Sequence, residues 1–131
     1  MPEKFFVYGS LKVGGYFASQ FDGSREDCKK AFLKGFNLYN LGQFPAIKEG
    51  KGIVHGEVHT FAPGDVEAIT KAMDRIEGFQ PGNEKHSLYI RKVLDIETED
   101  GEIEQANVYI FSQDLTDFKA KIVESGIYDL S

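Results

Sequence analysis

Two alternating segments, 88–98 and 102–111, are joined around Asp100-Gly101. Asp-Gly is a strong signal for a two-residue turn between two antiparallel strands. Because side chains alternate along a strand, Tyr89, Arg91 and Val93 share one face of the first arm. The second arm separates two faces, Ala106, Val108 and Ile110 on one and Asn107, Tyr109 and Phe111 on the other. The pattern predicts a β-hairpin, and with it a sheet that is at least partly antiparallel.

The segment 65–79 predicts a helix in which a carboxylate stands on the apolar side. Asp65 is suited to the N-cap and Gly78 to a left-handed residue at the C-terminal end. The apolar stripe consists of Val66, Ile69, Met73 and Ile76. At about 100° per residue, Glu77 projects about 20° from the start of this stripe.

A buried carboxylate without a partner costs several kcal/mol, so the position of Glu77 needs an explanation. In one interpretation the last helical turn frays and Glu77 reaches solvent. In the other, Glu77 is a partly buried catalytic carboxylate. Glu67 and Asp74 are both expected to lie off the stripe, and so to point away from the core.

The remaining segments predict a small curled sheet. Strands are predicted at 4–8, 31–41, 44–47 and 53–61, whereas the polar segment 16–30 is predicted to be a loop. Gly35 and Gly56 at strand centres fit the bends of a strongly curled barrel. A second amphipathic helix is predicted from Leu115, Phe118 and Ile122. We therefore expect one α+β domain over residues 1–131, built on an antiparallel or mixed sheet.

Composition narrows the class of protein. The net charge is −6 and the basic residues form no cluster, which argues against nucleic-acid and anionic-membrane partners. No apolar run approaches the length of a membrane span, and no signal peptide is expected. A single cysteine, Cys28, excludes an internal disulfide and fits a reducing compartment. We expect a cytoplasmic protein; the oligomeric state is not predicted.

A glycine-rich segment, Gly9-Ser10-Leu11-Lys12-Val13-Gly14-Gly15, directly follows the first predicted strand. A glycine there permits positive φ, and successive N–H groups can then form a nest for a carboxylate or an oxyanion. An ordinary glycine-rich turn is the alternative interpretation. The residues that complete a phosphate-binding loop are missing.

Other reactive side chains carry weaker hypotheses. His55, Glu57 and His59 share a face of one predicted strand, but ligands two residues apart are separated by about 6–7 Å and no fourth ligand is evident. We therefore predict a solvated polar face and no metal. Cys28 paired with a histidine, or Ser10 on its turn, are less favoured nucleophiles.

Three motifs occur in order along the chain: Tyr8-Gly9-Ser10-Leu11-x-x-Gly14, Asp74-x-x-Glu77-Gly78 and Tyr89-x-Arg91. Together with the middle segment 35–58, they resemble the γ-glutamylcyclotransferase-like family, particularly its γ-glutamylamine cyclotransferase branch. The resemblance implies a small closed or nearly closed β-barrel flanked by helices, with a cavity at its mouth. It further implies that Tyr8, Gly9, Ser10 and Leu11 form a substrate-binding loop and that Glu77 is the catalytic base.

The chain departs from the family pattern in two places. Met73 stands where leucine is common, which is a tolerable exchange in a core. The segment between Glu77 and Tyr89 is longer than the pattern suggests, which leaves the shape of the cavity mouth, and so the substrate, open.

The expected reaction converts a small γ-glutamyl amine or amide to 5-oxoproline and a free amine, without a cofactor. Glu77 would take a proton from the substrate amine and later return it to the leaving amine. Tyr89 is expected to line the cavity, and Arg91 either binds a substrate carboxylate or pairs with an acidic side chain. The alternative function is a non-catalytic module that binds a carboxylate on the same barrel.

Overall fold

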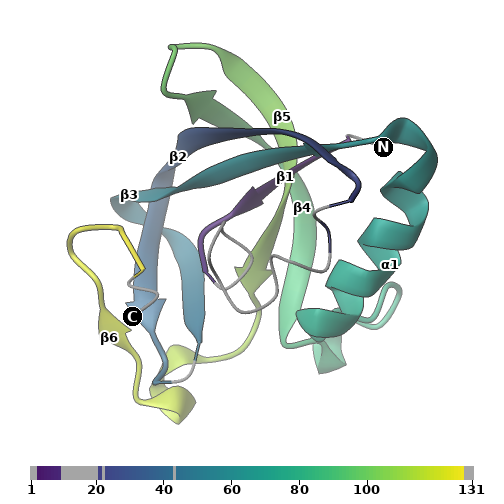
Figure 1. Ribbon diagram of the computed structural model, residues 1–131. Coiled ribbons are helices and arrows are strands. Elements are labelled where there is room, and N and C mark those ends of the chain that lie inside the picture. The colour runs from purple at the N-terminus through teal and green to yellow at the C-terminus, as the bar shows by residue number, and fades with distance from the viewer. Residues whose placement is uncertain (1–2, 10–20, 22, 43, 129–131) are drawn as a thin grey trace.

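A computed structural model of the chain describes residues 3–9, 21, 23–42 and 44–128. The strands are β1 Lys4–Val7, β2 Arg25–Asn40, β3 Pro45–Phe61, β4 Tyr89–Thr98, β5 Ile103–Phe111 and β6 Lys121–Ile122 (Figure 1). The α-helix α1 spans Val66–Ile76, and short 3-10 turns occur at Pro63–Asp65, Glu84–His86 and Leu115–Phe118.

Five of the strands close into a mixed barrel. The β1 strand pairs antiparallel with β3 and parallel with β5, while β5 pairs antiparallel with β4. The ring is completed because β2 pairs antiparallel with both β4 and β3. The short β6 strand extends the sheet beside the end of β2. The predicted α+β class and the small mixed barrel are therefore confirmed, and Figure 1 shows α1 lying against one side of the barrel.

The hairpin of β4 and β5 has the predicted alternation, but its loop holds three residues, 99–101, and not the two of the predicted Asp100-Gly101 turn. Gly101 takes a φ of 84°, and the N–H of Thr98 donates to the carbonyl oxygen of Glu102 over 2.8 Å. Ala106 and Val108 point into the barrel, whereas Tyr109 packs on its outside. The period of two was sufficient to predict the two faces of this pair, whereas a two-residue turn would have placed Glu99 opposite Glu102, one residue out of the observed register.

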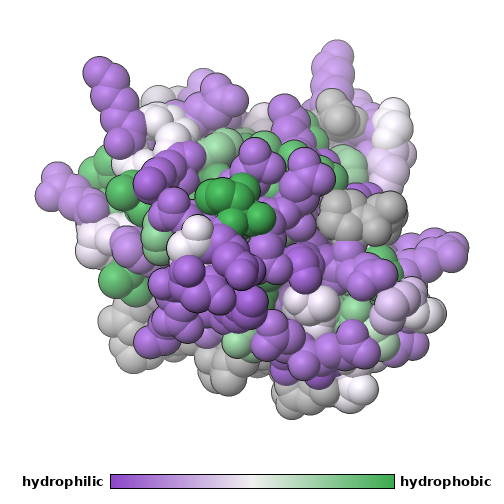
Figure 2. Space-filling view, turned by 90° about the horizontal axis from the view of Figure 1, so that it is seen from above, coloured by the Kyte–Doolittle hydropathy of each residue, from purple (hydrophilic) through white to green (hydrophobic). Residues whose placement is uncertain are grey.

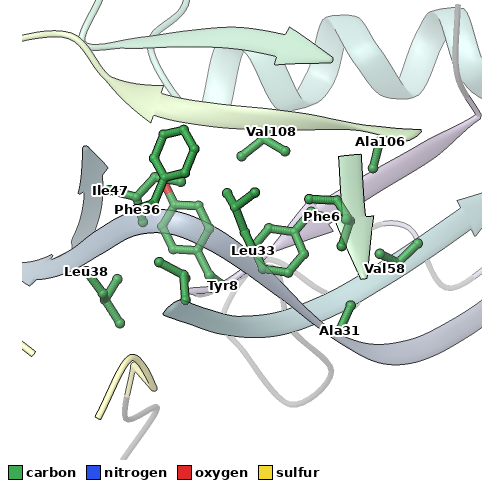
Figure 3. Close-up of a cluster of buried hydrophobic side chains, with 12 residues drawn as sticks. Phe6, Tyr8, Ala31, Leu33, Phe36, Leu38, Ile47, Val58, Ala106 and Val108 are labelled. Atoms are coloured by element: carbon green, nitrogen blue, oxygen red, sulfur yellow. The ribbon is translucent and has the colours of Figure 1, made fainter. Parts of the chain in front are cut away.

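The barrel separates two hydrophobic clusters. The interior cluster draws on all five barrel strands, and Figure 3 shows its side chains converging. It consists of Phe6, Tyr8, Ala31, Leu33, Phe36, Leu38, Ile47, Val54, Val58, Ile96, Ala106 and Val108. The outer cluster packs α1 against the outside of the barrel, with Val66, Ile69 and Met73 on the helix and Phe5 and Phe111 on the strands. Alternate residues of β1 thus serve the two clusters.

Both glycines predicted at bends have a physical role. Gly35 has a φ of 86° and lies at a register shift between β2 and β3, as expected for a bulge. A Cβ atom on Gly56 would lie 2.3 Å from the carbonyl oxygen of Val7, so only glycine allows β1 to approach β3 this closely.

Three predicted elements were wrong. Residues 25–30 were predicted as loop but form the first part of β2, because they pair with β3 from Arg25 to Lys30. The two strands predicted at 44–47 and 53–61 are one continuous strand, β3. The second predicted helix is only the 3-10 turn Leu115–Phe118, which ends at Lys119 with a φ of 51° before β6 begins.

The surface carries little contiguous apolar area on the face seen in Figure 2, where hydrophobic side chains form small groups among hydrophilic ones. Within the described part of the chain, α1 is too short and too polar to cross a membrane.

Candidate active site

The C-terminal end of α1 is held by a Schellman motif. The N–H of Gly78 donates to the carbonyl oxygen of Arg75 over 3.3 Å, and the N–H of Phe79 donates to that of Asp74 over 2.8 Å. Gly78 has the predicted left-handed conformation, with a φ of 67°. Glu77 is therefore the C-cap residue in a defined turn, and its N–H still donates to the carbonyl oxygen of Met73.

The N-terminal end of α1 differs from the prediction. Asp65 occupies the N-cap position, but its side chain makes no capping hydrogen bond. Its carboxylate instead accepts a hydrogen bond from the hydroxyl of Ser24 over 2.9 Å. This bond ties the start of the helix to the segment that leads into β2.

Glu77 is half-buried, and burial raises its pKa to about 7. Its charge also contributes to raising the pKa values of Tyr8, Tyr89 and Tyr109, after the larger effect of their own burial. The Glu77 carboxyl group is therefore close enough to these three phenols to act on them electrostatically. A carboxyl group with a pKa near 7 can both accept and donate a proton at neutral pH.

The tyrosine hydroxyls near Glu77 are fixed by main-chain acceptors. The Tyr8 hydroxyl donates to the carbonyl oxygen of Tyr109 over 2.6 Å, and the Tyr89 hydroxyl donates to that of Pro45 over 2.5 Å. Because burial raises the pKa of both tyrosines, they stay neutral donors at physiological pH. They join β1, β3, β4 and β5 around the same region.

Asp74 is buried, although the helical stripe predicted that it points away from the core. It is 7% exposed, and it accepts hydrogen bonds from Arg91 Nε over 2.9 Å and from the Tyr109 hydroxyl over 2.5 Å. The helix buries a wider face than the stripe, and a charged partner on β4 compensates the Asp74 carboxylate. Sequence reasoning missed Tyr109 as a partner, although the hairpin register places it opposite Arg91.

Arg91 is bound to protein groups on several sides. Besides Asp74, its Nη1 donates to Asn107 Oδ1 over 3.3 Å, and its guanidinium lies 5.6 Å from the centroid of the Phe79 ring. The Asn107 side chain in turn donates to the carbonyl oxygen of Lys4 over 3.1 Å. This network matches the structural interpretation of Arg91, while its predicted contact with a substrate carboxylate stays a prediction.

Gly9 has a different role from the one expected. It is buried, and its φ lies outside the left-handed region, so positive φ is not the reason for glycine here. A Cβ atom on Gly9 would lie 2.6 Å from Pro45 Cγ. Glycine is therefore required here because Pro45, the first residue of β3, packs directly against this position. Ser10 and Leu11, the other members of the predicted binding loop, lie outside the described residues.

The predicted polar face on β3 is only partly solvated. His55 is exposed beside Phe32, whereas His59 is 1% exposed and its Nε2 lies 2.9 Å from Glu57 Oε1. Partial desolvation and the neighbouring Glu57 carboxylate raise the pKa of the Cys28 thiol to about 11, so the thiol is protonated at neutral pH, which disfavours Cys28 as a nucleophile.

Similarity to known proteins agrees with this fold. The family model for gamma-glutamyl cyclotransferase, AIG2-like, matches residues 5–130. The chain therefore belongs to the AIG2-like gamma-glutamyl cyclotransferase family. No curated protein sequence matches the chain.

Solved structures share the architecture. Protein ytfP from Escherichia coli has a TM-score of 0.68 and 25% sequence identity over 95% of each chain. An uncharacterized protein from Pyrococcus horikoshii has a TM-score of 0.61 and 20% identity, over 96% of this chain and 89% of that one. A structure of a gamma-glutamyl cyclotransferase has a TM-score of 0.56 and 15% identity, over 91% of this chain and 68% of that one. The last two similarities show a common fold alone.

Proposed function

We propose that the protein is a γ-glutamyl cyclotransferase that converts a γ-glutamyl amine to 5-oxoproline and a free amine. One observation carries the proposal: burial raises the pKa of Glu77 to about 7, at a fixed helix end in a chain of this family. Family membership supports the class of reaction. The choice of an amine as the leaving group rests on the resemblance of the sequence motifs to the γ-glutamylamine branch.

In the proposed mechanism, Glu77 first takes a proton from the α-ammonium group of the substrate. The freed nitrogen forms a bond to the γ-carbonyl carbon, and the carbonyl oxygen becomes an oxyanion. When the oxyanion collapses, the bond between the γ-carbon and the leaving nitrogen breaks. Glu77 gives its proton to the leaving nitrogen, and the new ring nitrogen, which still carries two protons, releases one to solvent, where it protonates the free amine. Protons therefore balance over one turnover. A well-placed general base of this kind accelerates the reaction by about 10²–10⁴-fold.

The walls of the site would serve the reaction by holding the substrate in a folded rotamer. Because the attack is intramolecular, orientation supplies much of the rate enhancement. Tyr8 and Tyr89 are held by main-chain carbonyls and thus present fixed rings rather than mobile ones. We propose that the loop of Gly9, Ser10 and Leu11 binds the α-carboxylate or the oxyanion through its amides, and that Tyr89 and Arg91 border the glutamyl group.

The test compares the wild type with Glu77→Gln on a panel of γ-glutamyl amines and dipeptides. The readouts are 5-oxoproline and free amine. We expect the variant to fold and to lose about 10²-fold or more in turnover, as removal of a general base does. Glu67→Gln is the matched control, since Glu67 lies on the same helix with an exposed side chain paired to Lys71.

Two results would contradict the mechanism in different ways. Equal turnover by the wild type and Glu77→Gln would exclude Glu77 as the base. Absence of turnover on every substrate, together with binding of 5-oxoproline by the wild type, would favour the carboxylate-binding module instead.

A further inference from the structure

A second group of reactive side chains lies on the outer face of β2 and β3, where β3 approaches the start of α1. Cys28 on β2 and His59 on β3 are direct cross-strand partners. Glu57 precedes His59 by two residues on the same face of β3. The thiol, a carboxylate oxygen and an imidazole nitrogen of these residues all lie within 4.8 Å of one another.

Hydrogen bonds fix the protonation of His59. Arg25 Nε lies 3.1 Å from His59 Nδ1, and an arginine Nε only donates. Nδ1 is therefore the acceptor, and the neutral ring carries its proton on Nε2, which donates to Glu57 Oε1 over 2.9 Å. His59 is buried, Glu57 is half-buried and Cys28 is exposed, so the cluster opens to solvent at its thiol end.

We propose that Cys28, Glu57 and His59 bind a divalent cation of the zinc class. Thiolate, imidazole and carboxylate are the three kinds of side-chain ligand that Zn²⁺ takes. With zinc–ligand bonds of about 2.0–2.3 Å, tetrahedral ligands lie about 3.3–3.8 Å apart. Small side-chain rotations that move the ligand atoms by about 1 Å are therefore sufficient to bring them around an ion. The strand register holds the backbones in place during this change. Water fills the fourth position from the exposed side.

Binding changes the proton balance in a defined way. The Cys28 thiol loses one proton to solvent when sulfur bonds the ion. The His59 proton moves from Nε2 to Nδ1, so the ring stays neutral while Nε2 becomes a ligand. Glu57 exchanges its bond to the imidazole for a bond to the ion.

Arg25 opposes this change. In the bound state His59 Nδ1 carries a proton and no longer accepts from Arg25 Nε, so the guanidinium must turn away. It also lies 6.0 Å from the centroid of the Phe61 ring, a contact that can persist after the turn. The arginine therefore favours the metal-free tautomer, and its removal should strengthen metal binding.

This site is distinct from the one at Glu77. It adjoins the start of α1, whereas Glu77 caps the other end, and a helix of 11 residues is about 16 Å long at 1.5 Å per residue. The proposal therefore does not depend on the proposed activity.

The test is a titration of the whole chain with Co²⁺, a spectroscopic substitute for Zn²⁺, followed by competition with Zn²⁺. We expect one ion per chain and thiolate-to-cobalt charge-transfer absorption that Zn²⁺ abolishes. Cys28→Ser, at an exposed position, should remove this absorption and weaken binding by more than the roughly 10–100-fold that loss of an outer-shell partner costs. Glu57→Gln should also weaken the binding of Co²⁺, whereas Arg25→Met should tighten it.

His55→Gln is the matched control, because His55 lies on the same strand but is exposed and outside the cluster. It should bind Co²⁺ as the wild type does. Absence of charge-transfer absorption in the wild type at millimolar Co²⁺, or equal binding by Cys28→Ser, would overturn the proposal. Loss of binding in His55→Gln would overturn it too, since the ligands would then be different ones.

Discussion

Arg91 on β4 and Asp74 on α1 form an ion pair, with Nε and Oδ1 2.9 Å apart. Asp74 precedes Glu77, the C-cap residue of the same helix, by three residues. The Arg91 and Asp74 side chains are 17% and 10% exposed, respectively. This pair and the Tyr109 hydroxyl connect the last turn of the helix to the β4–β5 hairpin. The position of Glu77 is therefore determined by the barrel wall as well as by the helix.

Asp74→Ala should destabilise the protein. The substitution leaves the Arg91 guanidinium largely buried without its carboxylate, which costs about 2–4 kcal/mol when some contact with water remains. Chemical denaturation measures the free energy of unfolding. Glu67→Ala, which removes an exposed carboxylate from the same helix, should change it by less than about 1 kcal/mol. Equal effects of the two substitutions would mean that the buried pair contributes nothing specific.

The raised pKa of Glu77 predicts a pH-dependent effect of Glu77→Gln on stability. The unfolded carboxyl group titrates near 4.5 and the folded one near 7. The folded protein therefore binds the proton more tightly, and this contribution to stability is present below about pH 4.5 and lost as the pH rises through 7. Thermal unfolding at pH 5 and pH 8 measures the stability of Glu77→Gln relative to the wild type, and this relative stability should be higher at pH 8. A difference that does not change with pH would contradict the raised pKa.

The pH dependence of turnover follows from the same group. If Glu77 is the base, kcat/KM of the free enzyme should fall on the acidic side with an apparent pKa near 7. Glu77→Asp shortens the side chain by one methylene, and turnover should drop through misplacement of the carboxylate. Rates across pH 5–9 measure both effects. An acidic limb near pH 4.5 would indicate a solvated carboxylate.

Gly9→Ala should be destabilising although alanine is small. Its Cβ would lie 2.6 Å from Pro45 Cγ, so the ring or the β3 start must shift, and overpacking of this kind costs about 1–3 kcal/mol. Because the Pro45 carbonyl accepts from Tyr89, the shift should also disturb that hydrogen bond. Gly23→Ala is the control, since nothing lies within 4 Å of its Cβ position. Denaturation midpoints compare the two, and equal shifts would exclude the clash with Pro45.

The segment between Gly78 and Leu88 should affect the choice of leaving amine. Its ends are tied by a hydrogen bond from the Leu88 N–H to the Gly78 carbonyl oxygen over 3.0 Å, and Ser87 accepts from the Gln80 N–H over 2.8 Å. Removing residues 81–83 leaves the end-to-end bond available. We expect an altered preference among γ-glutamyl amines and nearly unchanged 5-oxoproline binding. An unchanged preference would mean that the segment is only a connector.

Features encoded by short sequence patterns could be predicted. Gly35, Gly78 and Gly101 each take a positive φ that few other residues adopt, so local chemistry reveals them. Glu77 was identified as a half-buried carboxylate because its position on the helix conflicts with its charge. Its role in catalysis stays a prediction.

Features that depend on distant partners could not be predicted in this way. Residues 25–30 are polar yet form a strand, because all of them except Glu26, at a register shift, have partners on β3. The position of Asp74 on the helix predicts a solvated side chain, whereas hydrogen bonds from Arg91 and Tyr109 on the hairpin hold it in the core. Cys28 and His59 are 31 positions apart in the sequence, and only the β2–β3 register brings them together.

Insertion of β1 between β3 and β5 has a consequence for synthesis of the protein. β1 is made first, but its parallel neighbour is made near the end, with Phe5 opposite Asn107. During translation, β1 must therefore wait, with one hydrogen-bonding edge and its phenylalanines uncovered, until β5 leaves the ribosome. Non-local pairing of this kind slows folding, and an uncovered apolar edge invites association with other chains. A nascent chain that stops short of β5 is the form of this protein most exposed to aggregation and most in need of a chaperone.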